Sequence, residues 1–111
     1  MRIIAGVNKG RNLISLGKGD PSAHLRPTSD RVRESIFNLI TGGRFGNKLE
    51  NCDILDLFAG TGALGLEALS RGAKSVIFVD NGQLAIQLLR KNISICNVES
   101  KTKVIKSDAT K

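Results

Sequence analysis

The stretch of the chain that decides its fold reads Ile54-Leu55-Asp56-Leu57-Phe58-Ala59-Gly60-Thr61-Gly62-Ala63-Leu64-Gly65. Its first five residues are a short, nearly continuous apolar run, which is typical of a strand buried on both faces of a parallel sheet. The residues after them match the G-x-G-x-x-G pattern of a strand-to-helix loop that holds a nucleotide cofactor, and Asp80 follows at the end of the next apolar run. We therefore predict a cofactor-binding loop between a strand and a helix.

The same alternation of strands and helices continues downstream. The predicted elements after the loop are a helix over residues 63–70, a strand over 75–79, a helix over 84–95 and a strand at 104–105. Because such alternation forms right-handed crossover units, the predicted fold class is α/β. The expected architecture is the N-terminal half of a Rossmann-like sheet with an N-terminal β-hairpin extension.

Upstream of the sheet, the sequence predicts a hairpin and a helix. Two β-prone runs, residues 2–7 and 11–16, flank a tight turn that contains Asn and Gly. After a loop, a helix begins near Thr28 or Ser29 and ends at Gly42-Gly43. Apolar residues at helical spacing predict its buried stripe, which is Val32, Ile36, Leu39 and Ile40.

The positive charge of the chain is concentrated in its first half. The net charge is +7, and residues 1–50 carry nine Lys or Arg against four Asp or Glu, whereas residues 51–111 carry eight against six. This asymmetry indicates a polyanionic partner, nucleic acid first, although a basic surface kept for solubility explains it equally well. We divide the chain into a basic hairpin and loop, residues 1–27, and a helix with a βαβαβ unit, residues 28–111.

Composition argues against several other classes of protein. No apolar run approaches the roughly 20 residues of a membrane span, and the N-terminus meets Gly6 and Lys9 too early for a signal peptide. We therefore expect a cytoplasmic chain with no membrane partner. Cys52 and Cys96 lack the paired spacing of a zinc site, so we expect two reduced thiols and no metal.

The carboxylate of Asp56 indicates which cofactor the loop holds. A dinucleotide such as NAD places a pyrophosphate at the helix N-terminus, and a carboxylate four residues before the first glycine would repel it. S-adenosylmethionine has no phosphate and presents a sulfonium and an ammonium, which a nearby carboxylate attracts. We therefore expect S-adenosylmethionine. An NAD-dependent oxidoreductase half is the alternative for the chain. For Asp56 itself, the alternative is a carboxylate that closes the loop or caps the helix.

Two more carboxylates fit the same donor. Asp80, 20 residues after Gly60, can accept hydrogen bonds from both hydroxyls of a ribose. Asp108 follows the third predicted strand and is placed to accept a hydrogen bond from the exocyclic amine of adenine. A turn aspartate explains Asp108 equally well.

Three blocks of the sequence together resemble one family. The blocks are Arg2-Ile3-Ile4-Ala5-Gly6 with Gly10-Arg11, Arg26-Pro27-Thr28-Ser29-Asp30-Arg31-Val32-Arg33-Glu34-Ser35-Ile36-Phe37-Asn38, and Asp56-Leu57-Phe58-Ala59-Gly60-Thr61-Gly62-Ala63-Leu64-Gly65-Leu66-Glu67-Ala68-Leu69-Ser70-Arg71-Gly72. In these blocks the chain resembles the RsmD-type methyltransferases, which methylate the N2 amine of a guanine in 16S ribosomal RNA. Ribosomal RNA, or the assembling small ribosomal subunit, is the partner that this resemblance implies.

The resemblance also implies the residues of the site. The implied contacts to S-adenosylmethionine are Asp56, Phe58, Ala59, Gly60, Thr61, Gly62, Asp80, Asn81, Asp108 and Ala109. The implied RNA-facing residues are Arg2, Arg11, Arg26, Thr28, Arg31 and Arg33. Guanidinium groups bind phosphate bidentately, but for any one of these arginines a salt bridge is an equally good explanation.

The sequence departs from the family in two places. Asn81 stands where the family has a second acid after Asp80, which puts a secondary donor contact in doubt. The family also carries an Asp/Asn-Pro-Pro-aromatic loop after its fourth strand, which holds the target amine and stacks on the flipped base. This chain has only two prolines, Pro21 and Pro27, and no strand is predicted after the third.

We therefore expect a donor-binding part of a methyltransferase that contributes no catalytic side chain and is inactive by itself. Its first strand would lie at an exposed apolar edge of the sheet. One alternative is a truncated, non-catalytic fragment that binds RNA and the donor. Another is a chain that pairs with a separately encoded C-terminal half.

Overall fold

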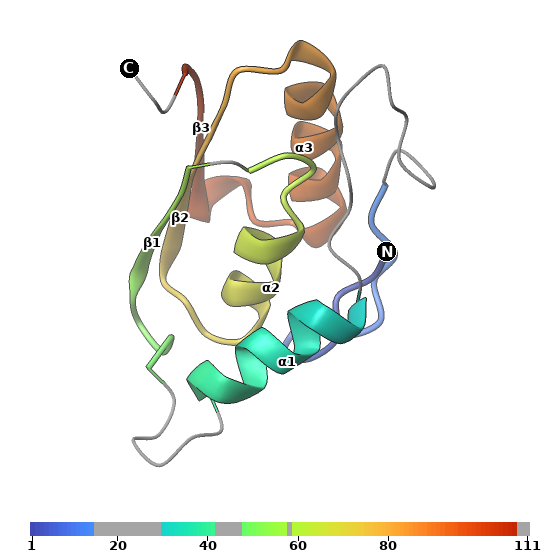
Figure 1. Cartoon of the computed structure of the whole chain (residues 1–111), viewed down its shortest axis with the longest axis vertical. Helices are drawn as coiled ribbons and strands as arrows, with labels where there is room; N and C mark the ends of the chain where they lie inside the picture. Colours follow the sequence, from blue (N-terminus) through green and yellow to red (C-terminus); the bar gives the residue numbers. More distant parts are fainter. Residues whose placement is uncertain (15–29, 42–47, 58, 109–111) are drawn as a thin grey trace.

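The computed structural model describes residues 1–14, 30–41, 48–57 and 59–108. Its elements are, in chain order, α1 (Asp30–Thr41), β1 (Asp53–Asp56), α2 (Ala63–Ser70), β2 (Ser75–Asp80), α3 (Gln83–Cys96), the 3-10 helix η2 (Glu99–Lys101) and β3 (Thr102–Lys106). The strands form one parallel sheet in the order β1-β2-β3, so α2 and α3 are the crossover helices (Figure 1). The predicted α/β class is confirmed.

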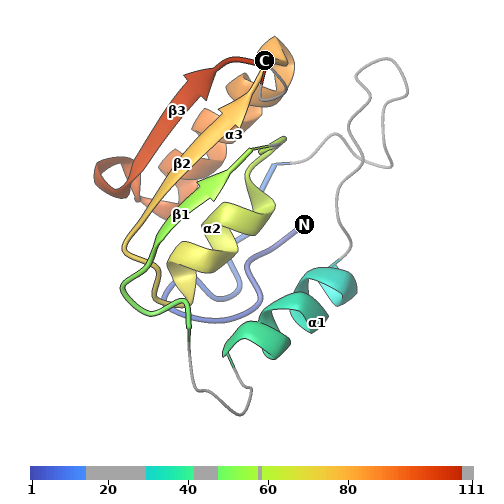
Figure 2. The same cartoon turned by 60° about the vertical axis from the view of Figure 1, so that its left-hand side comes forward.

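Helices cover one face of the sheet in the part of the chain described above. Figure 2 shows α2 and α3 on that face, with α1 farther out beside α2. The side chains of Val76 and Phe78 point to the covered face and are buried in the core with Leu66 and Leu89. On the opposite face the alternate residues are exposed, and Leu55 leaves 59% of its surface accessible. Among the described residues this face of the sheet has no covering helix, whereas a doubly wound fold has helices on both faces.

The third glycine of the fingerprint sets how closely α2 approaches the sheet. A Cβ atom on Gly65 would lie 2.3 Å from Cε1 of Phe78, so only glycine fits between α2 and β2. This close packing fixes α2 over β2, because Phe78 is itself fully buried. The N-terminus of α2 is thereby held at the carboxyl edge of the sheet.

The N-terminal hairpin is confirmed but is shorter than predicted. Ile3 N–H donates to the carbonyl of Arg11 (3.0 Å), Leu13 N–H donates to the carbonyl of Met1 (2.7 Å), and Arg2 and Asn12 form an antiparallel bridge. The predicted first strand over residues 2–7 is wrong beyond Ile4, because residues 5–10 form the turn that contacts α2. The residues of the predicted second strand beyond residue 14 lie outside the described part.

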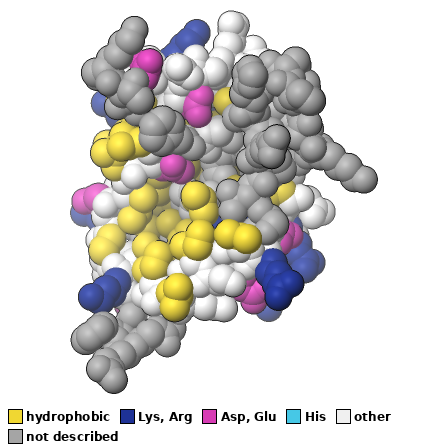
Figure 3. Space-filling model, in the orientation of Figure 1, with side chains coloured by type: hydrophobic (Ala, Val, Ile, Leu, Met, Phe, Trp, Pro, Cys, Tyr) yellow, Lys and Arg dark blue, Asp and Glu magenta, His cyan; other side chains and the backbone are white. Residues whose placement is uncertain are grey.

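Helix α1 buries a different face from the one predicted. Its buried residues are Arg33 and Phe37, whereas Val32, Ile36 and Leu39 of the predicted stripe are exposed, Leu39 to 82%. Ile40, the fourth residue of the stripe, is partly buried and packs against the core as predicted. The cause is polar: Arg33 pairs with the buried Glu67, and the guanidinium of Arg71 lies over the Phe37 ring, 5.1 Å from its centroid. Figure 3 shows the resulting hydrophobic side chains gathered over α1 and toward β1.

The two edges of the sheet differ in chemistry. At one edge, the exposed residues of β3 include Lys103 and Lys106, and lysines discourage pairing with a further strand. At the other edge, β1 and the turn after it expose Leu55 and Leu57, as predicted for an apolar edge strand. No helix within the described ranges is long and apolar enough to cross a membrane.

Candidate functional site

The loop between β1 and α2 is fixed by backbone hydrogen bonds and by glycine conformations. Ala59 N–H donates to the carbonyl of Val79 (3.1 Å), and Gly62 N–H donates to the carbonyl of Ala59 (2.9 Å). Gly60 and Gly62 have φ values of 55° and 92°, a region that other residues rarely adopt. Gly62 also precedes α2 and supplies no side-chain cap, and the first N–H groups of a helix have no partner within the helix itself.

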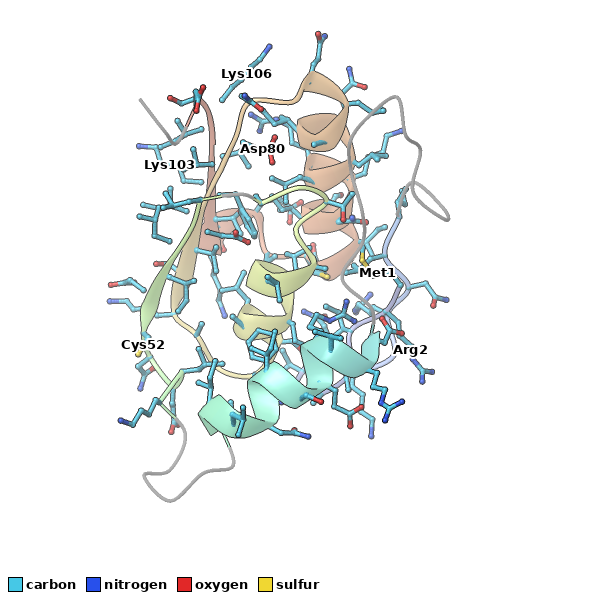
Figure 4. The ribbon with its side chains drawn as sticks, viewed as in Figure 1. Met1, Arg2, Cys52, Asp80, Lys103 and Lys106 are labelled. Carbon is cyan, nitrogen blue, oxygen red and sulfur yellow. The ribbon has the colours of Figure 1, made fainter. Side chains whose placement is uncertain are left out.

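Asp80 joins this loop to the ends of the other two strands. Its Oδ2 accepts a hydrogen bond from Gly60 N–H (2.9 Å) and its Oδ1 accepts one from Gly82 N–H (2.8 Å). Its own carbonyl accepts from Ser107 N–H, just after β3 (3.0 Å). Figure 4 shows Asp80 at the end of β2, near Lys106 at the end of β3. A carboxylate has about four acceptor positions, so each oxygen can still accept a ligand hydroxyl.

The other predicted donor contacts lie along the same edge. Asp56 ends β1 and is half-buried, Asp108 lies two residues beyond β3 and is half-buried, and Asn81 is exposed directly after Asp80. The carboxyl ends of parallel strands meet at one edge, which is where open α/β sheets bind ligands. Phe58 and Ala109 lie outside the described residues.

These groups fit S-adenosylmethionine better than a phosphate-bearing cofactor. The edge presents Asp56 and Asp80 around the loop, and carboxylates there favour a cationic ligand with hydroxyl groups. The uncapped N-terminus of α2 suits the carboxylate of the donor's methionine part. The loop also packs closely against α3. A Cβ atom on Gly62 would lie 2.4 Å from Cδ1 of Leu89, so Gly62 and Leu89 are in direct contact.

The described residues contain no group of three His, Cys, Asp or Glu side chains that could hold a metal ion. Cys52 and Cys96 are both free thiols. Burial raises the pKa of Cys96 above its usual value, with Arg11 lowering this pKa and Glu67 raising it to smaller extents. A buried thiol with a raised pKa is a poor nucleophile.

A buried carboxylate that the sequence analysis missed fastens the hairpin to α2. Both Glu67 oxygens accept backbone hydrogen bonds from the hairpin, Oε1 from Ile4 N–H (2.9 Å) and Oε2 from Ala5 N–H (3.1 Å). Each oxygen also meets an arginine: Nε of Arg33 at 3.4 Å and Nε of Arg71 at 2.8 Å. The signal in the sequence was an acid within the otherwise apolar and small residues of α2.

Arg33 was predicted to face RNA, and its position argues against that role. Its side chain is fully buried, and beside Glu67 it contacts the carbonyl of Arg2 and Oδ1 of Asp30 (3.0 Å). A guanidinium enclosed in this way has no surface to offer a phosphate. We therefore correct the prediction: Arg33 joins α1 to the hairpin and to α2.

The other predicted RNA-facing residues have different surroundings. Arg2 and Arg31 are exposed, and Arg2 lies near the start of α1, 4.0 Å from Asp30 (Figure 4). Arg11 is exposed but donates hydrogen bonds to Oδ1 of Asn8 (2.8 Å) and to the carbonyl of Ile95 (3.2 Å). Arg26 and Thr28 lie outside the described residues.

A second residue that the sequence analysis missed lies beneath the glycine loop. Asn92 of α3 is fully buried and donates a hydrogen bond to the carbonyl of Thr61 (2.9 Å). The only sequence signal was a polar residue among the inward residues of α3, between Leu89 and Ile93. Thr61 also lies close to the hairpin, since its Oγ1 is 4.0 Å from Sδ of Met1.

Comparison with known proteins finds relatives that match nearly the whole length of this chain. The family model described as Conserved hypothetical protein 95 matches residues 1–111. The "Putative rRNA methyltransferase YlbH" of Bacillus subtilis is 43% identical over 98% of this chain and 54% of its own length. The "Ribosomal RNA small subunit methyltransferase D" of Haemophilus influenzae is 41% identical over 90% of this chain and 47% of its own length.

A solved structure has the same fold. The "Putative methyltransferase yhhF" of Escherichia coli superposes with a TM-score of 0.77 and 35% identity, covering 98% of this chain and 53% of that one. The chain thus spans about half the length of the relatives that it matches. On the family match over all its residues, the chain belongs to the Conserved hypothetical protein 95 family, that of the RsmD-type methyltransferases.

Proposed function

We propose that this chain is the donor-binding part of an S-adenosylmethionine-dependent methyltransferase that acts on a guanine N2 amine of small-subunit ribosomal RNA. One observation carries the proposal: carboxylates at the ends of β1 and β2 flank a glycine loop whose helix N-terminus is uncapped. The names of the Bacillus and Haemophilus relatives support the ribosomal RNA substrate. A cytoplasmic location belongs to the same proposal.

Each carboxylate at this edge of the sheet is assigned to a different part of the donor. Asp56, at the end of β1, is placed for the cationic part of the donor, and Asp80 for the ribose hydroxyls. Asp108, beyond β3, is placed for the adenine amine. When bound, S-adenosylmethionine supplies an electrophilic methyl group on its sulfonium. Transfer to a neutral amine needs proximity and orientation, so the work of these residues is to bind and orient.

The hairpin and the start of α1 supply the surface that we assign to RNA. Arg2, Lys9 and Arg31 are exposed there, and the hairpin is fastened to α2 through Glu67. Exposed cations of this kind position a nucleic acid through its phosphates without reading its sequence. The choice of nucleotide would then come from other parts of the enzyme.

The acceptor side of the site needs residues that this chain does not have. Its sequence holds no Pro-Pro pair for the loop that holds the target amine. The exposed Leu55 and Leu57 of the β1 edge and the bare face of the sheet fit a further parallel strand with its covering helices. We assign this edge to a C-terminal half of the kind that the longer relatives carry, in the same or a separate polypeptide.

A pair of matched variants tests the donor site. Asp56→Ala removes the carboxylate at the carboxyl end of β1, and Asp53→Ala removes one at the amino end of the same strand. We expect Asp56→Ala to weaken S-adenosylmethionine binding about tenfold or more, which corresponds to about 1.4 kcal/mol. Asp53→Ala should leave the affinity within about twofold of the unaltered chain. Equal affinities for both variants would contradict the proposed site.

A further inference from the structure

The side chain of Asn92 connects two segments that are far apart in the sequence. Its Oδ1 accepts a hydrogen bond from Ile14 N–H (2.6 Å), and its Nδ2 donates to the carbonyl of Ile14 (2.9 Å). The same Nδ2 donates to the carbonyl of Thr61, in the middle of the glycine loop (2.9 Å). The amide is fully buried. One side chain of α3 therefore joins the second strand of the hairpin to the loop that we assign to the donor.

A second contact brings the other end of the hairpin to the same loop residue. Oγ1 of Thr61 lies 4.0 Å from Sδ of Met1, and the carbonyl of Met1 accepts from Leu13 N–H at 2.7 Å. Both strands of the hairpin thus converge on Thr61, one directly and one through Asn92. A displacement of the hairpin in this region would disturb the hydrogen bond that orients the Thr61 peptide.

The chemistry of the connection requires an amide. Ile14 offers both a donor and an acceptor, and Thr61 offers a second acceptor, so the connecting group must accept once and donate twice. Asparagine does this with its carbonyl and its two N–H atoms. An aspartate of the same shape would keep the bond to Ile14 N–H and would face two carbonyl oxygens without a proton to donate.

We infer that Asn92 is a positioning residue that couples RNA binding at the hairpin to donor binding at the glycine loop. This inference rests on the proposed function, because it takes the hairpin as the RNA side and the loop as the donor side. Coupling between two binding sites is reciprocal, and typical values are about 5- to 150-fold in affinity. RNA that holds the hairpin in place also holds Asn92 and, through it, the Thr61 carbonyl, so we expect RNA to tighten donor binding. By reciprocity the donor then tightens RNA binding by the same factor.

The test measures this factor in the 111-residue chain. S-adenosylmethionine is titrated calorimetrically with and without a saturating transcript of small-subunit ribosomal RNA, for the unaltered chain, Asn92→Asp and Asn97→Asp. Asn97 is the matched control, since it is exposed and ends the same helix. We expect RNA to tighten donor binding about fivefold or more in the unaltered chain and in Asn97→Asp. In Asn92→Asp the factor should fall to about one.

Two outcomes contradict the inference while leaving the proposed function intact. In one, the unaltered chain binds both ligands without any effect of RNA on donor affinity. In the other, Asn92→Asp keeps the full coupling factor. If the unaltered chain binds no S-adenosylmethionine at all, the proposed function fails, and the coupling fails with it.

A measurement on the unaltered chain keeps the inference testable if Asn92→Asp does not fold. Hydrogen exchange of the Ile14 amide reports directly on the bond to Asn92. We expect addition of S-adenosylmethionine, for which we propose no contact with Ile14, to slow this exchange at least threefold. An Ile14 exchange rate that is the same with and without the bound donor would overturn the coupling.

Discussion

The carboxylate of Glu67 and the guanidinium of Arg33 lie 3.4 Å apart, and both side chains are fully excluded from solvent. This pair joins α1, α2 and the N-terminal hairpin, because Glu67 also accepts two hairpin N–H groups. Buried ion pairs contribute little net stability, but the loss of one partner leaves an uncompensated charge in the interior. The pair therefore fastens α1 and the hairpin to α2.

Replacement of Glu67 by Ala should destabilise the chain strongly. It leaves the buried Arg33 with only the partly exposed carboxylate of Asp30, and it leaves the N–H groups of Ile4 and Ala5 without acceptors, so we expect a loss of about 3–5 kcal/mol. Urea denaturation followed by circular dichroism measures this. Glu99→Ala, at an exposed acid of η2, is the control and should cost less than about 0.5 kcal/mol. Similar losses for the two variants would contradict the role of Glu67.

Two glycines of the hairpin turn allow a matched test of its contact with α2. Gly6 and Gly10 have nearly the same φ, 86° and 85°. A Cβ atom on Gly6 would lie 1.7 Å from the carbonyl oxygen of Ser70, whereas a Cβ atom on Gly10 would have no described atom within 4 Å. Gly10→Ala should therefore cost only the backbone penalty of about 1–2 kcal/mol. Gly6→Ala should cost more, because the turn must also leave α2. Equal denaturation midpoints would indicate that the hairpin is not held against α2.

Replacement of the exposed Arg2 or Arg31 should weaken RNA binding, whereas replacement of the buried Arg33 should lower the stability of the chain. Arg2→Ala and Arg31→Ala should weaken binding to a small-subunit ribosomal RNA transcript, and each should lower the slope of log K against log salt by about one. Arg33→Ala should lower stability instead, because its guanidinium is enclosed. Fluorescence anisotropy at several salt concentrations measures the slopes, with the exposed Lys74→Ala as control. Unchanged slopes for both Arg2→Ala and Arg31→Ala would refute an RNA surface at the hairpin.

The apolar β1 edge predicts complementation by a second polypeptide. The 111-residue chain alone should transfer no methyl group to small-subunit ribosomal RNA, because it has no acceptor loop. Addition of a polypeptide covering the part of the Haemophilus influenzae relative that this chain does not match should restore transfer of a radiolabelled methyl group. Leu55→Lys, at an exposed position of β1, should prevent this restoration. Methyl transfer by the chain alone would show that this division of the site is wrong.

The sequence predicted the βαβαβ unit well because its signals are local. The apolar runs that predict β1 and β2 and the glycine loop that predicts the start of α2 are each a few residues long and lie next to one another in the sequence. Asp80 was predicted as a site residue because it stands at the end of an apolar run. The inward face of α1 was not predictable in this way. Apolar periodicity indicated Val32, Ile36 and Leu39 as the inward face. The residue that is buried instead is Arg33, and its buried partner Glu67 lies more than 30 residues farther along the chain.

The two residues missed in the site were hidden for the same reason. Asn92 and Glu67 bind backbone atoms of the hairpin that are 78 and 63 residues away in the chain. Backbone N–H and C=O groups are present at every position, so no residue pattern marks them as partners. A polar residue on the inward side of an apolar helix was the only sign of either contact.

Calorimetric titration of the unaltered chain with S-adenosylmethionine and, separately, with NAD shows which of the two cofactors the glycine loop binds. The carboxylates beside the glycine loop attract a cationic donor and repel a pyrophosphate, so the choice between the two ligands depends on the chemistry of this edge. We expect saturable binding of one S-adenosylmethionine per chain and no measurable binding of NAD. Saturable binding of NAD without binding of S-adenosylmethionine would contradict this expectation.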